Sequence, residues 1–251
     1  MDTNTELKLA VLIDADNVPY SNIKGMLEEI ARYGTPTFKR IYGDWTKPTL
    51  SGWKTVLLEN AITPVQQYSY TSGKNSSDSA LIIDAMDILY TGHIDGFCII
   101  SSDSDFTRLA TRLREAGKKV FGIGEKKTPY AFIAACNKFI FIEILQKETK
   151  EDAPIKKHAA KKAGKNKPEA PGMNTDLQKL IISSINDLAE EDGWVFLSTI
   201  GNHIIKKEPS FDPRNYGFKK LLDIIKNIPA IEMEERTTGK NSVAHLWVRV
   251  K

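Results

Sequence analysis

The first 145 residues alternate between short apolar runs and segments in which apolar residues recur every three or four positions. Short runs without polar alternation are typical of strands buried on both faces of a sheet, whereas the wider spacing is typical of helices. The pattern predicts strands at residues 7–13, 37–42, 63–68, 97–101, 119–123 and 139–144. It predicts helices at residues 22–33, 50–60, 78–90, 104–116 and 130–135. Because strands alternate with helices, we expect an α/β fold with a mostly parallel sheet flanked by helices.

The pattern changes after residue 145. Residues 146–173 lack apolar periodicity and carry eight lysines against four acidic residues, which predicts a flexible, lysine-rich linker. Beyond it the sequence predicts helices at 177–189, 197–205 and 215–226, and a β-hairpin from 231–235 and 244–250. Three helices and a hairpin predict a small winged-helix domain. We therefore expect a first domain at 1–145, a linker at 146–173 and a second domain at 174–251.

Acidic residues follow two of the predicted strands. Asp14 and Asp16 come directly after residues 7–13, and Asp103 and Asp105 follow residues 97–101. Ligands of open α/β sheets bind outside the carboxyl ends of the strands, so we expect these residues to share one acidic pocket. For Asp103 and Asp105, capping of the following helix is the alternative interpretation.

A third set of acidic residues lies on the predicted helix 78–90. Its helical wheel places Asp78 on the apolar, sheet-facing side at the helix start, Asp87 on the opposite side and Asp84 on the flank. We expect Asp78 to join the pocket, Asp87 to face water, and Asp84 to lie outside the pocket. For Asp78, the alternative is a first-turn partner of the helix dipole.

Several carboxylates in one pocket repel one another, by about 4 kcal/mol for a close pair at an intermediate dielectric. Such a cluster either raises the pKa values of its members or holds a cation. Oxygen ligands without His or Cys suit Mg²⁺ or Mn²⁺, and a pair of such ions can activate water for phosphodiester cleavage. Asn17 and Ser101 or Ser102 are candidates to hydrogen-bond the carboxylates, although a purely structural hydrogen bond is equally open for each.

At these residues the chain resembles the NYN domain, in its LabA-like bacterial branch. The segments that carry the resemblance are Ile13–Asn17, Gly73–Asp78, Ile83–Asp87, Ser101–Phe106 and Gly122–Pro129. The resemblance covers nearly all of residues 7–145. It implies a PIN-like, FLAP-nuclease-like α/β fold and metal-dependent ribonuclease activity. It also implies catalytic, metal-binding roles for Asp14, Asp78, Asp103 and Asp105, with Asn17 beside them.

Residues 174–250 resemble the LOTUS module, also called OST-HTH, which is a winged-helix RNA-binding unit. The resemblance is carried by Gly217–Leu222 and Leu246–Arg249. It implies RNA, single-stranded or structured, as the partner. Lysines can follow its phosphates without reading sequence, although a solvated spacer is the alternative interpretation of the linker lysines. The residues expected to contact RNA are Lys74, Lys156, Lys157, Lys161, Lys162, Lys219, Lys220, Lys240 and Arg236.

Composition argues against several other classes of protein. Hydrophobic residues make up 41% of the chain, and no apolar stretch approaches the roughly 20 residues of a membrane span. The acidic, polar start is unlike a secretory signal. Cys98 and Cys136 lie in apolar runs, which indicates core positions rather than a disulfide or a metal site. We expect a cytoplasmic protein without membrane contact, and a homodimer is compatible with the sequence.

Three functions fit these observations. The first is a divalent-metal-dependent endoribonuclease with a tethered RNA-binding domain. The second is an RNA-binding or regulatory protein whose nuclease-like pocket is slow or inactive. The third is a phosphatase, because Asp14–Val18 also fits the nucleophile pattern of haloacid-dehalogenase-type enzymes. The short spacing of the second acidic motif and the RNA-binding domain count against a phosphatase. We favour the first function, with the second as the alternative.

Overall fold

The computed structural model describes residues 6–68, 76–151, 174–237 and 244–251. The chain divides into two compact units, Met1–Ala153 and Pro154–Lys251. The limits of the linker that we inferred from composition stay a prediction.

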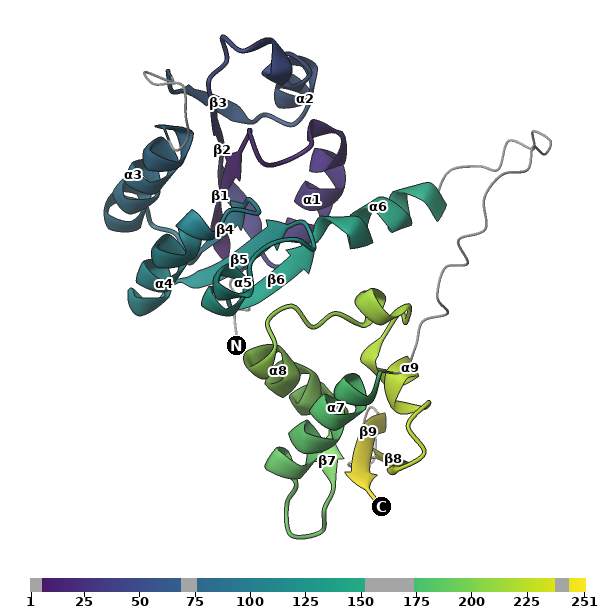
Figure 1. Ribbon diagram of the computed structural model, residues 1–251. Helices are drawn as coiled ribbons and strands as arrows, with labels where there is room; N and C mark the ends of the chain where they lie inside the picture. Colours follow the sequence, from purple (N-terminus) through teal and green to yellow (C-terminus); the bar gives the residue numbers. More distant parts are fainter. Residues whose placement is uncertain (1–5, 69–75, 152–173, 238–243) are drawn as a thin grey trace, which may run out of the picture. The chain divides into compact units, whose positions relative to one another are not determined.

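A six-stranded sheet forms the centre of the first unit, and all its strand pairs are parallel (Figure 1). Its strands are β1 (Lys8–Asp14), β2 (Thr35–Gly43), β3 (Thr63–Gln66), β4 (Gly96–Ile100), β5 (Lys119–Gly124) and β6 (Lys138–Phe141). Their order in the sheet is β3-β2-β1-β4-β5-β6. The chain therefore adds strands on one side of β1 and, from β4 onward, on the other. Such a reversal of strand order opens a crevice at the carboxyl ends of β1 and β4.

Helices cover both faces of this sheet. They are α1 (Ile23–Ile30), α2 (Trp53–Glu59), α3 (Ser76–Thr91), α4 (Thr107–Glu115), α5 (Tyr130–Ala135) and α6 (Ile142–Glu151), with 3-10 turns η1 (Tyr20–Asn22), η2 (Pro48–Leu50) and η3 (Ser104–Phe106). Figure 1 shows α1 and α6 on one face, and α3 and α4 on the other. Alternate residues of β1 enter different cores: Val11 packs with Met26 of α1, and Leu12 packs with Leu81 of α3. This double burial explains why the apolar runs show no polar alternation.

The last predicted strand of this unit is wrong beyond Phe141. β6 ends there, and α6 begins at Ile142 and continues to Glu151. Ile142, Ile144 and Leu145 are buried in the helix. A continuous apolar run does not by itself distinguish a buried strand from the buried side of a helix. Here the apolar run at residues 139–145 forms the end of β6 first and the start of α6 after it.

The second unit combines helices with a small antiparallel sheet. Its elements are α7 (Thr175–Leu188), β7 (Val195–Phe196), α8 (Leu197–Lys207), η4 (Pro213–Tyr216), α9 (Leu221–Ile225), β8 (Ile231–Thr237) and β9 (Ala244–Val250). The strand order is β7-β9-β8, and Ile181, Ile200, Ile224 and Val248 are among its buried core. The sequence did not predict the two-residue strand β7.

The predicted helix 215–226 is two shorter elements, η4 and α9. Gly217 separates them with a φ of 80°, a backbone conformation that glycine adopts at little cost. Because a continuous α-helix requires negative φ at each residue, the helix cannot pass through this position.

Candidate functional site

Asp14 ends β1 at the carboxyl edge of the sheet, beside the reversal of strand order. Its side chain is almost completely buried. Oδ1 accepts a hydrogen bond from the backbone N–H of Asp16 at 3.1 Å, and Oδ2 accepts from Asn17 Nδ2 at 2.7 Å and from Ser101 Oγ at 2.8 Å. Burial raises the pKa of Asp14, while these hydrogen bonds act against the rise. The carboxylate is thus fixed by its own turn and by the end of β4.

Asp103 and Asp105 occupy the turn between β4 and α4. The backbone N–H of Asp103 donates to Ser101 Oγ at 3.0 Å, and that of Asp105 donates to Asp103 Oδ1 at 2.9 Å. Asp103 is therefore the cap of η3, as the capping interpretation expected. Since the cap occupies one oxygen of Asp103, capping does not prevent the other oxygen from facing the crevice.

Three carboxylates converge at this edge. One oxygen from each of Asp78, Asp103 and Asp105 lies within 4.8 Å of the other two. Asp78 is in the first turn of α3 and is 7% exposed. Its pKa is raised to about 6, first by burial and then by the charges of Asp14, Asp103, Asp105 and Asp16. Asp14 is thus near enough to act on Asp78, although it is not one of the three converging residues.

The donor set of this acidic centre suits a hard divalent cation. It consists of carboxylate oxygens from Asp78, Asp103 and Asp105, with no His or Cys among them. Oxygen-only ligands favour Mg²⁺ or Mn²⁺ over softer metals. A divalent charge would also offset the repulsion that raises the pKa of Asp78. The residues therefore fit the metal that the sequence predicts.

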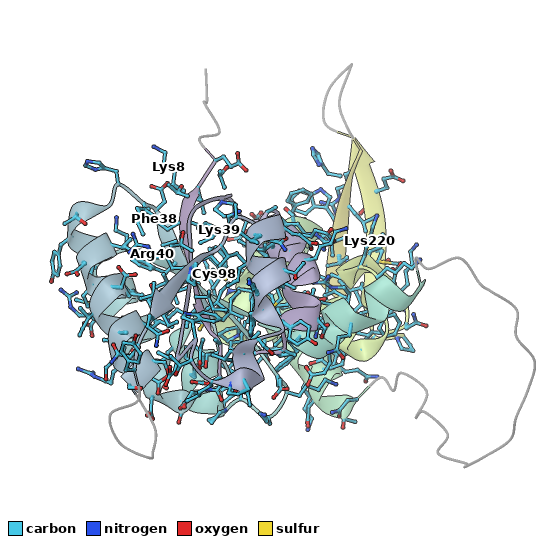
Figure 2. All side chains as sticks on the ribbon, turned by 90° about the horizontal axis from the view of Figure 1, so that it is seen from above. Lys8, Phe38, Lys39, Arg40, Cys98 and Lys220 are labelled. Atoms are coloured by element: carbon cyan, nitrogen blue, oxygen red, sulfur yellow. The ribbon has the colours of Figure 1, made fainter. Side chains whose placement is uncertain are left out.

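The remaining acidic candidates lie outside the three converging residues. Asp16 is exposed and accepts a hydrogen bond from Ser77 Oγ at 3.4 Å. Asp87 is exposed, as its place on the helical wheel predicted. Asp84 pairs with Arg40 and with the hydroxyl of Tyr42, so it ties α3 to β2. In Figure 2, Arg40 lies between β2 and α3.

A buried carboxylate at the same edge, Asp44, was not among the sequence candidates. It follows β2 directly and is 8% exposed. Its Oδ1 accepts from Thr46 Oγ1 at 2.6 Å and from Gln66 Nε2 at 3.0 Å, which joins the loop after β2 to the end of β3. Its place immediately after a predicted strand, the criterion that selected Asp14, could have identified it.

The turns after β4 and β5 are also held together. Ser102 Oγ accepts from the backbone N–H of Glu125 at 2.9 Å. Gly124 allows this close approach, because a Cβ there would lie 2.6 Å from the carbonyl oxygen of Ser101. The edge that carries the acidic centre is therefore tied across neighbouring strands.

The predicted RNA contacts lie partly within the described residues. Lys219 and Lys220 are exposed before α9. The guanidinium of Arg236 lies 4.7 Å from the ring centre of Trp194 and 5.3 Å from that of Trp247, and it pairs with Glu234 at 3.0 Å. Lys74, Lys156, Lys157, Lys161, Lys162 and Lys240 lie outside the described residues.

A parallel α/β sheet with carboxylates at its strand-order reversal is consistent with the PIN-like class of nuclease folds. The family model of the NYN domain matches residues 8–143, and the chain belongs to this family. The model of the OST-HTH/LOTUS domain matches residues 172–243. Both matches confirm the resemblance drawn from the sequence, and membership of the LabA-like branch stays a prediction.

Solved structures offer only distant similarity. A crystal structure of a protein of unknown function from Vibrio parahaemolyticus is 20% identical over 55% of this chain and 94% of its own, with a TM-score of 0.46. Solution structures of an uncharacterized protein from Nitrosomonas europaea and of a Chromobacterium violaceum protein are 28% and 32% identical, with TM-scores of 0.30 and 0.26. They cover 39% and 31% of this chain, and 92% and 82% of their own. At TM-scores below 0.5 these similarities carry no conclusion about function.

No curated protein matches the chain. In the part of the chain that the structure describes, no helix combines the length and the apolar character needed to cross a membrane.

Proposed function

We propose that the protein is a divalent-metal-dependent endoribonuclease with a tethered RNA-binding domain. The observation that carries this proposal is the convergence of Asp78, Asp103 and Asp105 at the carboxyl edge of an NYN domain. The NYN domain is of the PIN-like nuclease type, and the OST-HTH/LOTUS domain is an RNA-binding module. Together they favour an RNA phosphodiester as the substrate and Mg²⁺ or Mn²⁺ as the cofactor.

The proposal gives the side chains of the centre separate roles. Asp78, Asp103 and Asp105 would hold the divalent cation. When bound, the cation supplies the positive charge that activates an attacking water and stabilises the leaving oxygen. Asp14, whose carboxylate is fixed by Asn17 and Ser101, adds negative charge next to Asp78. This chemistry requires no His or Lys as a general base.

The substitution Asp103→Asn tests the proposal directly. Asn also caps helical turns well, so the variant should keep the cap of η3 and a nearly unchanged melting temperature. We expect the parent chain to cleave labelled RNA with Mg²⁺ or Mn²⁺ and the variant to lose this cleavage, and EDTA should have the same effect on the parent. Asp87→Asn, on the exposed side of α3, is the matched control and should cleave normally. Cleavage that survives both Asp103→Asn and EDTA would refute the proposal.

The alternative is an RNA-binding or regulatory protein with a slow or inactive pocket. It is favoured by one observation: both oxygens of Asp14 already accept hydrogen bonds from Asp16, Asn17 and Ser101. Oδ2 of Asp14 therefore has both acceptor sites occupied, whereas Oδ1 accepts a single hydrogen bond; direct ligation of a cation by Asp14 stays a prediction. Tight RNA binding without turnover at either metal would support this alternative. The phosphatase hypothesis has no support from the family matches.

A further inference from the structure

Two exposed cations flank the turn that carries Asp103 and Asp105. Arg108 lies in the first turn of α4, directly after η3. Lys126 lies in the turn after β5, next to Glu125, whose backbone N–H donates to Ser102 Oγ. Both cations are therefore at the carboxyl edge of the sheet. Arg112, one helical turn after Arg108, donates to the hydroxyl of Tyr90 in α3, so Arg108 is on the α3 side of the turn and Lys126 is on its β5 side.

Neither side chain has a hydrogen-bond or ion-pair partner among the described residues, whereas neighbouring cations do. Arg112 donates to the hydroxyl of Tyr90 at 2.9 Å, and Arg114 donates to the carbonyl oxygen of Ala134 at 3.2 Å. Lys127 pairs with Glu125. The backbone of Lys126 is held, since its N–H donates to Glu143 Oε1 at 2.9 Å, but its ammonium group has no such partner in this part of the chain.

Other exposed cations, such as Lys8 and Lys119, also lack a side-chain partner in the described part of the chain, but they lie at the amino ends of their strands. Arg108 and Lys126 instead lie at the edge of the sheet that carries the acidic centre. An anion supplied from outside would engage both cations. A guanidinium binds a phosphate through two parallel hydrogen bonds, and an ammonium binds it as a point charge. A polynucleotide strand presents such phosphates on either side of the one that is cut.

We propose that Arg108 and Lys126 bind backbone phosphates of an RNA strand on the two sides of the turn that carries Asp103 and Asp105. This inference rests on the proposed function and adds a path for the substrate. On this path the strand passes Arg108 beside α3, crosses the η3 turn and passes Lys126 after β5. Because phosphate contacts carry no sequence information, the two residues position the strand without selecting its bases.

Binding of a short labelled single-stranded RNA to the full chain tests this surface. The measurements use Mg²⁺ and an Asp103→Asn background, so that the RNA stays intact. Arg108→Ala/Lys126→Ala should make the salt dependence of log Kd shallower by about 0.7 for each phosphate that the variant no longer neutralises. At near-physiological salt this corresponds to weaker binding on the order of tenfold. Arg108→Lys should retain the salt slope.

Lys8→Ala/Lys119→Ala is the matched control. It removes the same charge from exposed positions at the amino ends of β1 and β5, and Lys8 is labelled in Figure 2. We expect its affinity and salt slope to equal those of the parent. Equal effects of the two double variants would overturn the inference, as would an unchanged slope for Arg108→Ala/Lys126→Ala.

Cleavage kinetics separate this inference from the proposed function. With Asp103 intact, the loss of Arg108 and Lys126 should raise KM and leave kcat nearly unchanged. If the double variant shows the predicted decrease in salt slope but the unmodified chain never cleaves RNA, the nuclease proposal fails and the phosphate-binding surface stands. If the chain cleaves RNA and the double variant has the parent's KM, the surface fails and the nuclease proposal stands.

Discussion

Ser101 Oγ donates a hydrogen bond to Asp14 Oδ2 at 2.8 Å. The same hydroxyl accepts from the backbone N–H of Asp103 at 3.0 Å. Ser101 is fully buried, and one side chain therefore fixes the carboxylate at the end of β1 relative to the turn after β4. This role requires a group that both donates and accepts, which a serine hydroxyl does.

Replacing Ser101 by Ala should disturb both partners at once. The backbone N–H of Asp103 would lose its acceptor and Asp14 would lose one donor, so we expect a loss of about 1–3 kcal/mol in the free energy of unfolding. Cleavage of RNA should also fall. Ser104→Ala is the control, because its side chain is exposed in the same turn. Unfolding by urea measures the difference, and equal stability of the two variants would contradict the bridging role.

The raised pKa of Asp78 predicts a specific dependence of stability on pH. In the folded chain this pKa is about 6 against an ordinary value of 3.8, so the folded state binds the proton more tightly. Without divalent cations, stability should therefore fall as pH rises through this interval, by about 3 kcal/mol at most. Burial also raises the pKa of Asp14, which contributes with the same sign.

Asp78→Asn should remove this penalty. We expect the variant to melt higher than the parent at neutral pH in EDTA, and to show a flatter stability profile between acidic and neutral pH. With Mg²⁺ or Mn²⁺ the parent should melt higher than the variant, because cation binding stabilises the parent and not the variant. Asp87→Asn, exposed on the same helix, should leave the profile unchanged. A lower melting temperature for Asp78→Asn in EDTA at neutral pH would show that the buried charge of Asp78 does not destabilise the folded chain.

The contact of Asp84 with Arg40 and Tyr42 predicts a role in holding α3 on the sheet. Burial and the neighbouring Asp84 charge raise the pKa of Tyr42, so its hydroxyl stays protonated as a donor. Asp84→Ala would leave this buried hydroxyl without its acceptor, at a cost of about 1–3 kcal/mol. Asp87→Ala should change stability by about 0.5 kcal/mol or less. Thermal unfolding of the two variants side by side provides the comparison.

Arg236 predicts a measurable contribution to the second unit. Its guanidinium lies over the rings of Trp194 and Trp247, and a cation is attracted to the face of an aromatic ring. Arg236→Ala should therefore lower the melting temperature of this unit. The same variant tests the predicted RNA contact of Arg236, since an unchanged salt slope of RNA binding would contradict that contact.

The sequence predicted the architecture well where each element has one strong local pattern. The buried strands β1 and β4 coincide with apolar runs, and α5 spans Tyr130–Ala135 as expected. The errors arose at segments whose secondary structure depends on contacts with distant parts of the chain. Ile142 to Leu145 become helical within an apolar run, and β7 exists only through its pairing with β9. A two-residue strand leaves no periodicity of its own to detect.

The acidic centre was predictable only in part, for a similar reason. Strand ends and the helical wheel selected Asp14, Asp78, Asp103 and Asp105 as candidates. The sequence also named Asn17 and Ser101 or Ser102 as candidates to hydrogen-bond the carboxylates, but spacing along the chain could not show that Asn17 and Ser101 both donate to the same oxygen of Asp14. It also could not show that Asp84 turns toward Arg40 on β2.

The acidic centre and the buried Asp14 next to it come from three separate parts of the chain: the first turn of α3 and the turn after β4 carry the centre, and the end of β1 carries Asp14. β4 pairs directly with β1, although β2 and β3 precede it in the chain. A chain interrupted before β4 would lack Asp103 and Asp105 altogether, so a fragment made during synthesis or left by proteolysis would have no complete centre. Any hydrolytic activity would thus appear only after β4 has paired with β1.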